Sequence, residues 1–113
     1  MLKIFHNPRC TKSRETLQII EESGEMVEVV EYLKTVPTEE ELSEIVRMLG
    51  IRPEELLRKG EAIFKENFKG KTLTDKEWIK AMVENPKLIE RPIVIKGQRA
   101  VIGRPPEKVM ELL

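Results

Sequence analysis

The sequence is poor in the residues that build disulfides and metal centres. Its 113 residues include one cysteine, Cys10, and one histidine, His6. A single cysteine cannot form an internal disulfide, which fits a reducing compartment, so we expect a cytoplasmic protein. One cysteine and one histidine are also too few ligands for a structural zinc ion, so we expect no metal site.

The sequence also lacks an excess of charge of one sign, and it lacks long apolar runs. Lysine and arginine together number 20, as do aspartate and glutamate, so no net charge favours nucleic acid or an anionic membrane as a partner. No apolar run is long enough to span a membrane, and the first residues lead directly into a predicted strand. We therefore expect neither a membrane span nor a signal peptide. This length suits one domain with a modest core, and we expect a monomer.

The residues that remain for chemistry are concentrated in the segment 6–14, which holds both Cys10 and His6. Residues 2–5 have the pattern of a short buried strand, and apolar side chains at helical spacing follow over residues 15–22. The Asn-Pro pair at 7–8 ends the strand, because proline lacks an N–H and moves its predecessor away from helical angles. Cys10 is therefore predicted to lie in the turn between a strand and the N-terminus of a helix.

This position favours a reactive sulfur. The first N–H groups of a helix are unpaired and carry a partial positive charge, so they stabilise a thiolate and can hold an oxyanion. Arg9, Lys12 and Arg14 add positive charge nearby, and together these groups should bring the Cys10 pKa below the value of about 8.5 for free cysteine. The alternative is that Cys10 is a small buried hydrophobic residue, as many free cysteines are.

Cys10 and Ser13 have the spacing of a Cys-X-X-Cys site in which serine replaces the second cysteine. An internal disulfide is then impossible, so an external thiol must resolve any adduct, with glutathione and glutaredoxin as the expected cytosolic donors. Ser13 either bonds the Cys10 thiolate or only supplies polarity to the first helical turn. His6 is either a cation that tunes Cys10 or a hydrogen-bonded structural histidine.

The rest of the chain predicts the order β-α-β, a helical insert, then β-β-α. Gly24 is placed to cap the first helix in the left-handed conformation, and residues 26–32 alternate as a strand, which completes a parallel βαβ unit. In the middle, Thr-X-X-Glu capping boxes at 38–41 and 74–77 begin two helices. Further elements are a short helix from Pro53, a hairpin of residues 93–95 and 100–102, and a final short helix from residue 105.

This order is that of an α/β thioredoxin-like fold, with a mixed four-stranded sheet and an inserted helical subdomain. We expect one domain over residues 1–113, with the insert spanning roughly residues 36–88. In this fold a proline just before the third strand faces the reactive cysteine, and Pro92 occupies that place. Because X-Pro bonds adopt the cis form at modest cost, we predict a cis bond between Arg91 and Pro92.

Three arginines, Arg58, Arg91 and Arg104, are candidate ligands of an oxyanion. The topology places Arg91 on the loop that faces the thiol and Arg104 at the end of the strand paired beside it. The guanidinium fork matches a tetrahedral oxyanion in shape and charge. Taken singly, each arginine is also compatible with a solvated surface charge or a partner of a helix C-terminus.

The sequence resembles the ArsC family, the glutaredoxin-linked arsenate reductases of the thioredoxin fold, over essentially the whole chain. Four segments in this order carry the resemblance: Phe-His-Asn-Pro-Arg-Cys-Thr-Lys-Ser-Arg at 5–14, Leu-Leu-Arg-Lys at 56–59, Arg-Pro-Ile-Val at 91–94 and Arg-Pro at 104–105. The resemblance implies that the Cys10 thiolate attacks arsenate, that glutathione is a co-substrate, that glutaredoxin completes reduction to arsenite, and that no cofactor is tightly bound. It also implies residue roles: Arg58, Arg91 and Arg104 bind the oxyanion, and His6, Ser13 and Arg14 assist the thiolate.

Two other functions stay open at this point. One is a non-catalytic interaction protein on the same fold, like the regulators of a sister branch that bind RNA polymerase; that branch typically has a redox Cys-X-X-Cys, which Ser13 removes here. The other is a paralogue that reduces a different substrate. A Cys10 pKa well below that of free cysteine favours catalysis, whereas an ordinary pKa favours a binding module.

Overall fold

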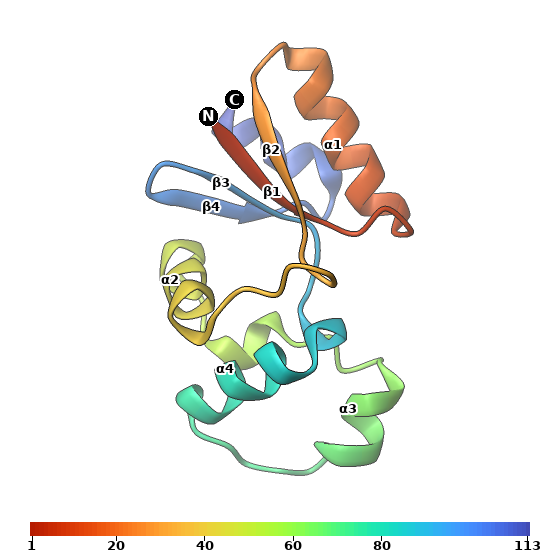
Figure 1. Cartoon of the computed structure of the whole chain (residues 1–113), viewed down its shortest axis with the longest axis vertical. Helices are drawn as coiled ribbons and strands as arrows, with labels where there is room; N and C mark the ends of the chain where they lie inside the picture. Colours follow the sequence, from red (N-terminus) through yellow and green to blue (C-terminus); the bar gives the residue numbers. More distant parts are fainter. The chain divides into compact units, whose positions relative to one another are not determined.

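The computed structural model describes all residues, 1–113. The chain forms two compact units. Figure 1 shows the whole chain, with colours that follow the sequence. Met1–Thr35 and Arg91–Leu113 together make the sheet unit, and Val36–Glu90 make the helical unit. The predicted insert of residues 36–88 corresponds to the helical unit, which ends at Glu90.

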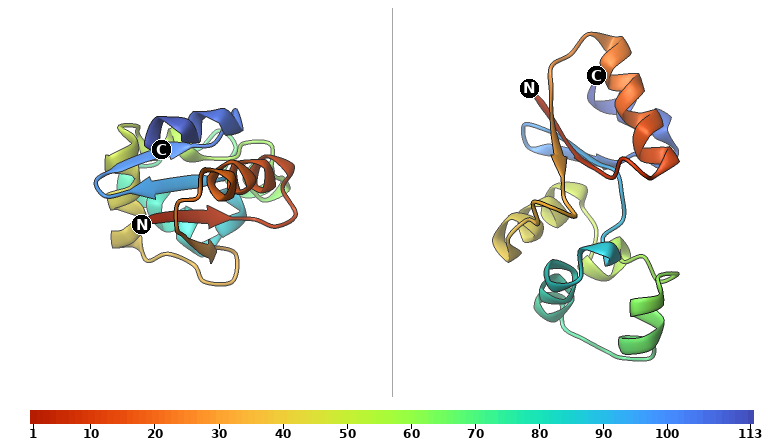
Figure 2. Two further views of the ribbon diagram at one scale, coloured as in Figure 1. Left: turned by 90° about the horizontal axis from the view of Figure 1, so that it is seen from above. Right: turned by 45° about the vertical axis from the view of Figure 1, so that its right-hand side comes forward.

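The sheet unit contains one mixed sheet of four strands in the order β2-β1-β3-β4 (Figure 2). The central strand β1 pairs parallel with β2 and antiparallel with β3, and β3 pairs antiparallel with β4. This is the predicted mixed four-stranded sheet, with strands β1 (Leu2–His6), β2 (Val27–Glu31), β3 (Ile93–Lys96) and β4 (Arg99–Ile102).

Two helical elements pack over one face of this sheet, α1 (Thr11–Ser23) and the 3₁₀ helix η3 (Pro106–Leu112). The core between these helices and the sheet is made of alternate residues of β1, one residue of β3 and apolar side chains of both helices. Its members are Leu2, Ile4, Ile20, Val94, Val109 and Leu112, all nearly or fully buried. Gly24 ends α1 in the left-handed conformation with φ +80°, as predicted.

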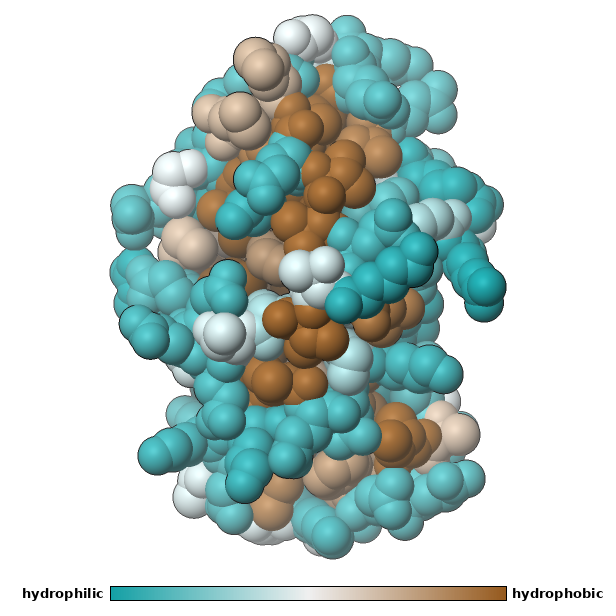
Figure 3. Space-filling model, viewed as in Figure 1, coloured by the Kyte–Doolittle hydropathy of each residue, from teal (hydrophilic) through white to brown (hydrophobic).

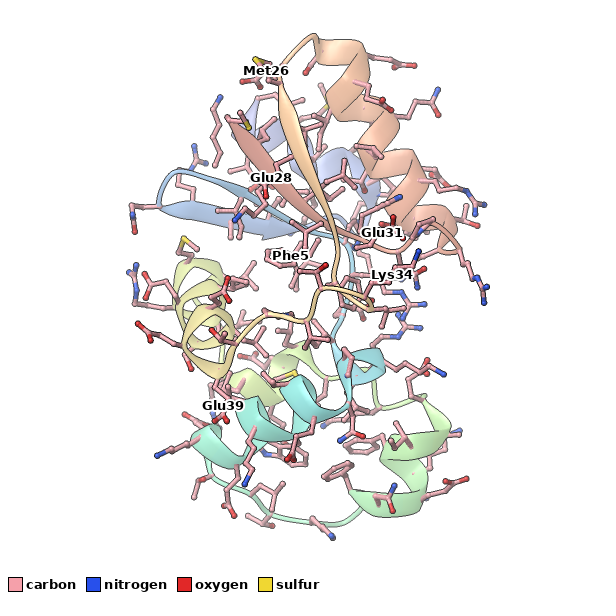
Figure 4. The ribbon with its side chains drawn as sticks, viewed as in Figure 1. Phe5, Met26, Glu28, Glu31, Lys34 and Glu39 are labelled. Atoms are coloured by element: carbon pink, nitrogen blue, oxygen red, sulfur yellow. The ribbon has the colours of Figure 1, made fainter.

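The outer strand β2 leaves part of the sheet unit open to solvent. Val29 is 45% exposed and Met26, just before the strand, is 73% exposed, and apolar side chains are visible on the sheet unit in Figure 3. Glu28 and Glu31 from the same strand interrupt this surface with charge (Figure 4). Charged residues on an edge strand oppose pairing with other chains.

The helical unit is built from short elements around buried apolar side chains. Both predicted capping boxes are present, at Thr38 with Glu41 and at Thr74 with Glu77. The short helix predicted from Pro53 is a 3₁₀ helix, and two further elements, α3 and the 3₁₀ helix η2, were not predicted. The elements are α2 (Glu39–Leu49), η1 (Pro53–Leu56), α3 (Ala62–Asn67), α4 (Asp75–Glu84) and η2 (Pro86–Leu88).

Three aromatic rings hold α3 against α4. Phe64 lies 6.2 Å from Trp78 between ring centroids, and Phe68 lies 6.0 Å from Trp78. Trp78 is 3% exposed, so these rings belong to the buried part of the helical unit. None of the helices in the structure combines the length and the apolar character needed to cross a membrane.

The peptide bond between Arg91 and Pro92 is cis, as the sequence predicted. The bond between Arg104 and Pro105 is also cis, which was not predicted. Both arginines of the sheet unit that were proposed as oxyanion ligands therefore precede a cis proline.

We expect Ile20→Ala to lower the free energy of unfolding by about 2–5 kcal/mol, because it removes a fully buried side chain from the core between α1 and the sheet. Urea denaturation followed by circular dichroism measures this change. The control is Gln18→Ala on the exposed side of the same helix, which should change stability by no more than about 0.5 kcal/mol. A cost for Ile20→Ala as small as that of the control would contradict this core.

Candidate active site

The turn between β1 and α1 is organised by Asn7. Its carbonyl oxygen accepts the N–H of Cys10 at 2.9 Å, and its side-chain Oδ1 accepts the N–H of Arg9 at 3.0 Å. These bonds place Cys10 as the extended N-cap residue of α1, with φ −94° and ψ 122°. The predicted position of Cys10 at the start of a helix is therefore what the structure contains.

Ser13 joins the end of β1 to the first turn of α1. Its Oγ accepts the backbone N–H of Asn7 at 3.1 Å and lies 2.6 Å from His6 Nδ1. The N–H of Asn7 can only donate, so the Ser13 oxygen is the acceptor in that bond, while the direction of the bond with His6 follows the tautomer of the ring. The Ser13 hydroxyl thus bonds His6 and Asn7. One of the two expectations was that it would bond the Cys10 sulfur instead.

His6 is a buried, uncharged histidine at neutral pH. Burial lowers the pKa of His6 below its ordinary value, and the positive charge of Arg14 adds to this, although Glu31 and Glu21 oppose it. Glu31, labelled in Figure 4, is paired with Lys34 at 3.5 Å. Of the two expectations for His6, the structure favours the hydrogen-bonded structural histidine over a cation that tunes Cys10.

The Cys10 thiol is 8% exposed and has a lowered pKa. Burial by itself raises the pKa of Cys10, because it disfavours the charged thiolate. The backbone N–H of Ser13, the hydrogen bond and charge of the Arg91 guanidinium, and the backbone N–H of Lys12 together lower the pKa by more than burial raises it. Ser13 thus acts on the sulfur through its backbone, as expected at a helix N-terminus.

Arg104 connects the sulfur to the loop that precedes β3. Its Nη2 donates to Cys10 Sγ at 3.6 Å, and its Nε donates to the carbonyl oxygen of Arg91 at 2.8 Å. The structure therefore brings two of the three predicted arginines to Cys10, from positions more than eighty residues along the chain. Two guanidinium groups beside a thiolate can bind a tetrahedral anion as it approaches the sulfur.

Arg58, the third predicted arginine, belongs to the helical unit and is paired there. Its Nη1 donates to Glu90 Oε1 at 2.8 Å, and its Nε lies 3.5 Å from Glu61 Oε2. These carboxylates offset the charge of Arg58 within its own unit. Its role as an oxyanion ligand stays a prediction.

Arg14 holds the turn from outside. Its exposed guanidinium donates to the carbonyl oxygen of Pro8 at 3.0 Å and to Thr11 Oγ1 at 3.3 Å. Neither bond reaches the sulfur, and Arg14 is not among the groups that lower the Cys10 pKa. Direct assistance of the thiolate by Arg14 therefore stays a prediction. The two hydrogen bonds of its side chain stabilise the turn.

Two further residues behind the site escaped sequence reasoning, Thr16 and Gly103. Thr16 is fully buried, and its Oγ1 donates to the carbonyl oxygen of Lys12 at 2.8 Å and lies 3.5 Å from the carbonyl oxygen of Gly103. The glycine directly before Arg104 was the one available signal. The structure assembles no group of three or more histidine, cysteine, aspartate or glutamate side chains that could hold a metal ion.

A mixed sheet with a low-pKa cysteine at its first strand-to-helix turn and a cis proline before its third strand defines a thioredoxin-like protein. The model of the ArsC family matches residues 5–112. The chain belongs to the ArsC family.

Individual proteins of known sequence or structure agree with this assignment. The chain is 47% identical to the uncharacterized protein YfgD of Escherichia coli K12, over 99% of this chain and 96% of that protein. It is 43% identical to the arsenate reductase of Haemophilus influenzae, over 97% of both chains. The solved structure of an arsenate reductase from Vibrio cholerae matches it with a TM-score of 0.94 at 45% identity, covering 99% of this chain and 97% of that one.

We expect Arg91→Ala to raise the Cys10 pKa, because it removes a charge and a hydrogen bond that stabilise the thiolate. The pH dependence of the alkylation rate should then move to higher pH than in the parent protein. The control is Arg99→Ala, which removes an exposed arginine of the same sheet whose Nη2 bonds the Glu111 carbonyl. If both variants gave the parent pH profile, Arg91 would have no part in ionising the sulfur.

Proposed function

We propose that this protein is a monothiol arsenate reductase, in which Cys10 is the nucleophile and glutathione and glutaredoxin supply the resolving thiols. The observation that carries the proposal is the Cys10 sulfur with its lowered pKa, 3.6 Å from the guanidinium of Arg104 and hydrogen-bonded by Arg91. The printed names of the Haemophilus and Vibrio relatives support arsenate as the substrate.

The reaction begins at the sulfur. The Cys10 thiolate attacks arsenic(V) and displaces one arsenate oxygen as water, forming a sulfur–arsenic bond. Arg91 and Arg104 offset the negative charge that arsenate and thiolate bring together, in positions set before the substrate arrives. Arg58 is the proposed third cation.

Two external thiols complete the reduction. Glutathione displaces a second oxygen and adds its own sulfur to arsenic. The glutaredoxin thiolate then attacks the glutathione sulfur and forms a mixed disulfide with it. The electron pair of the bond between glutathione sulfur and arsenic stays on arsenic and reduces arsenic(V) to arsenic(III). Hydrolysis releases arsenite and returns the Cys10 thiol. Because Ser13 leaves the chain without a second cysteine, both reducing equivalents come from outside.

The reducing cytoplasm is the compartment in which these thiols are abundant, and we propose that the protein acts there as a monomer. A paralogue with another oxyanion substrate would use the same sulfur and arginines. A non-catalytic regulator would need neither a lowered Cys10 pKa nor the guanidinium groups around it.

We expect Cys10→Ser to abolish arsenite formation while leaving the fold intact, because no other sulfur nucleophile of this kind exists in the chain. The measurement is arsenite production from arsenate with glutathione and glutaredoxin, beside circular dichroism of the variant. Turnover surviving in the serine variant would exclude the thiol mechanism. No turnover by the parent protein under the same conditions would exclude arsenate as the substrate.

Among the arginines, we expect Arg91→Ala to lower kcat/KM more than Arg104→Lys does. Alanine removes the charge and should cost about 2–4 kcal/mol of transition-state stabilisation, whereas lysine keeps the charge and loses only the fork. Steady-state kinetics with arsenate measures both losses, and Arg99→Ala again serves as the control. Equal and small effects of the two site variants would show that substrate charge is neutralised elsewhere.

A further inference from the structure

Behind the two arginines of the sheet unit lies a glycine that has no room for a side chain. A Cβ atom on Gly103 would stand 2.5 Å from Thr16 Oγ1, 2.8 Å from Pro92 Cγ and 3.0 Å from Thr16 Cγ2. Four other glycines of the chain have positive φ angles, but Gly103 does not. Glycine is therefore required at this position for space and not for backbone conformation.

Gly103 is fixed on the opposite side by the loop before β3. Its N–H donates to the carbonyl oxygen of Pro92 at 2.9 Å, which continues the pairing of β3 with β4 beyond the ends of the strands. Gly103 is thus packed between Pro92 and Thr16. A displacement of Gly103 cannot be absorbed by the loop without breaking this backbone hydrogen bond.

Thr16 connects this packing to the first turn of α1. Its hydroxyl donates to the carbonyl oxygen of Lys12 at 2.8 Å, and the backbone N–H of Lys12 is one of the groups that stabilise the Cys10 thiolate. Because Thr16 is fully buried, it has no freedom to turn away from Gly103. The spacing between α1 and the segment after β4 is therefore set where Thr16 meets Gly103.

Arg104 follows Gly103 directly in the chain, so its backbone position depends on that contact. Its Nε is held by the Arg91 carbonyl at 2.8 Å, and its Nη2 reaches Cys10 Sγ at 3.6 Å. A hydrogen bond to sulfur of this length is already long, so an outward shift of Arg104 would weaken it further.

We propose that Thr16 and Gly103 are positioning residues, whose close packing sets the distance between the Arg104 guanidinium and the Cys10 sulfur. The kinetic consequence rests on the proposed function. The geometric one does not, because it concerns the sulfur of the resting protein. Neither residue touches the reacting atoms, so they act only through Arg104 and the first turn of α1.

The test is Gly103→Ala. The added methyl group should force α1 and the segment carrying Arg104 apart, so the alkylation profile of Cys10 should move to higher pH and kcat/KM for arsenate should fall on the order of ten- to a hundredfold. The matched control is Gly60→Ala: Gly60 has no positive φ angle and its Cβ would meet no atom within 4 Å. Gly60→Ala should leave both quantities unchanged.

A second variant removes most of the steric clash caused by Gly103→Ala. It also provides a test if the Gly103→Ala protein does not fold. Thr16→Ala removes both Thr16 atoms that a Cβ on Gly103 would meet, leaving only the Pro92 ring. The double variant Thr16→Ala with Gly103→Ala should therefore recover most of the Cys10 profile and of kcat/KM lost in Gly103→Ala. If Gly103→Ala alone does not fold, the comparison of Thr16→Ala with the double variant replaces it, and it should show only a small difference.

A third comparison shows whether Gly103 acts through Arg104. In an Arg104→Gln background, Gly103→Ala should produce a smaller shift of the Cys10 profile, because only the part that passes through the first turn of α1 remains. An equal shift with and without Arg104, or no shift in a folded Gly103→Ala protein, would overturn the proposal. If arsenate is not the substrate, no variant will turn it over, yet the pattern of Cys10 profiles should be the same.

Discussion

The hydrogen bonds of the Ser13 hydroxyl are the contacts on which the site depends. One oxygen atom accepts the N–H of Asn7 and meets the ring nitrogen of His6, so the last residue of β1 and the first turn of α1 are held together inside the protein. With that turn fixed, the backbone N–H of Ser13 is directed at the sulfur of Cys10 and lowers its pKa. His6, whose pKa is lowered by burial, contributes to this contact as a buried structural histidine.

The second requirement of the site is positive charge, and the sheet delivers it from a distant part of the sequence. β1 lies in the centre of the sheet, so the loop before β3 and the segment after β4 end near the turn that follows β1. Arg91 and Arg104 come from these two places, and a hydrogen bond from one to the backbone of the other joins them. Exposed basic residues next to Cys10 in the sequence, such as Arg14, bond the turn itself instead. The topology of the sheet therefore predicts which arginines lie beside the sulfur better than their distance from Cys10 along the chain does.

Local signals predicted much of the fold and part of the site. Capping boxes, the glycine cap of α1 and the proline before β3 depend on a few adjacent residues, so they can be read from the sequence. Helix α3 has only six residues and a single buried one, which is too short for a periodic pattern. The neutral state of His6 and the partners of the Ser13 hydroxyl depend on burial, and the need for glycine at position 103 depends on Thr16, 87 residues away along the chain. Such non-local facts cannot be deduced from a few adjacent residues, even where a glycine marks the position.

The long separation between Cys10 and its cations has a consequence for the newly made chain. Arg91, which helps to lower the Cys10 pKa, and Arg104, which bonds the sulfur, follow Cys10 by more than eighty residues, so Cys10 leaves the ribosome well before them. Until β3 and β4 have joined β1, the sulfur lacks the hydrogen bond and the charge of Arg91, which are part of what lowers its pKa, and contacts of such high sequence separation form slowly. The ionisation of Cys10 therefore reaches its final value only when the sheet is complete, because one of the groups that sets it belongs to the last strands to be made.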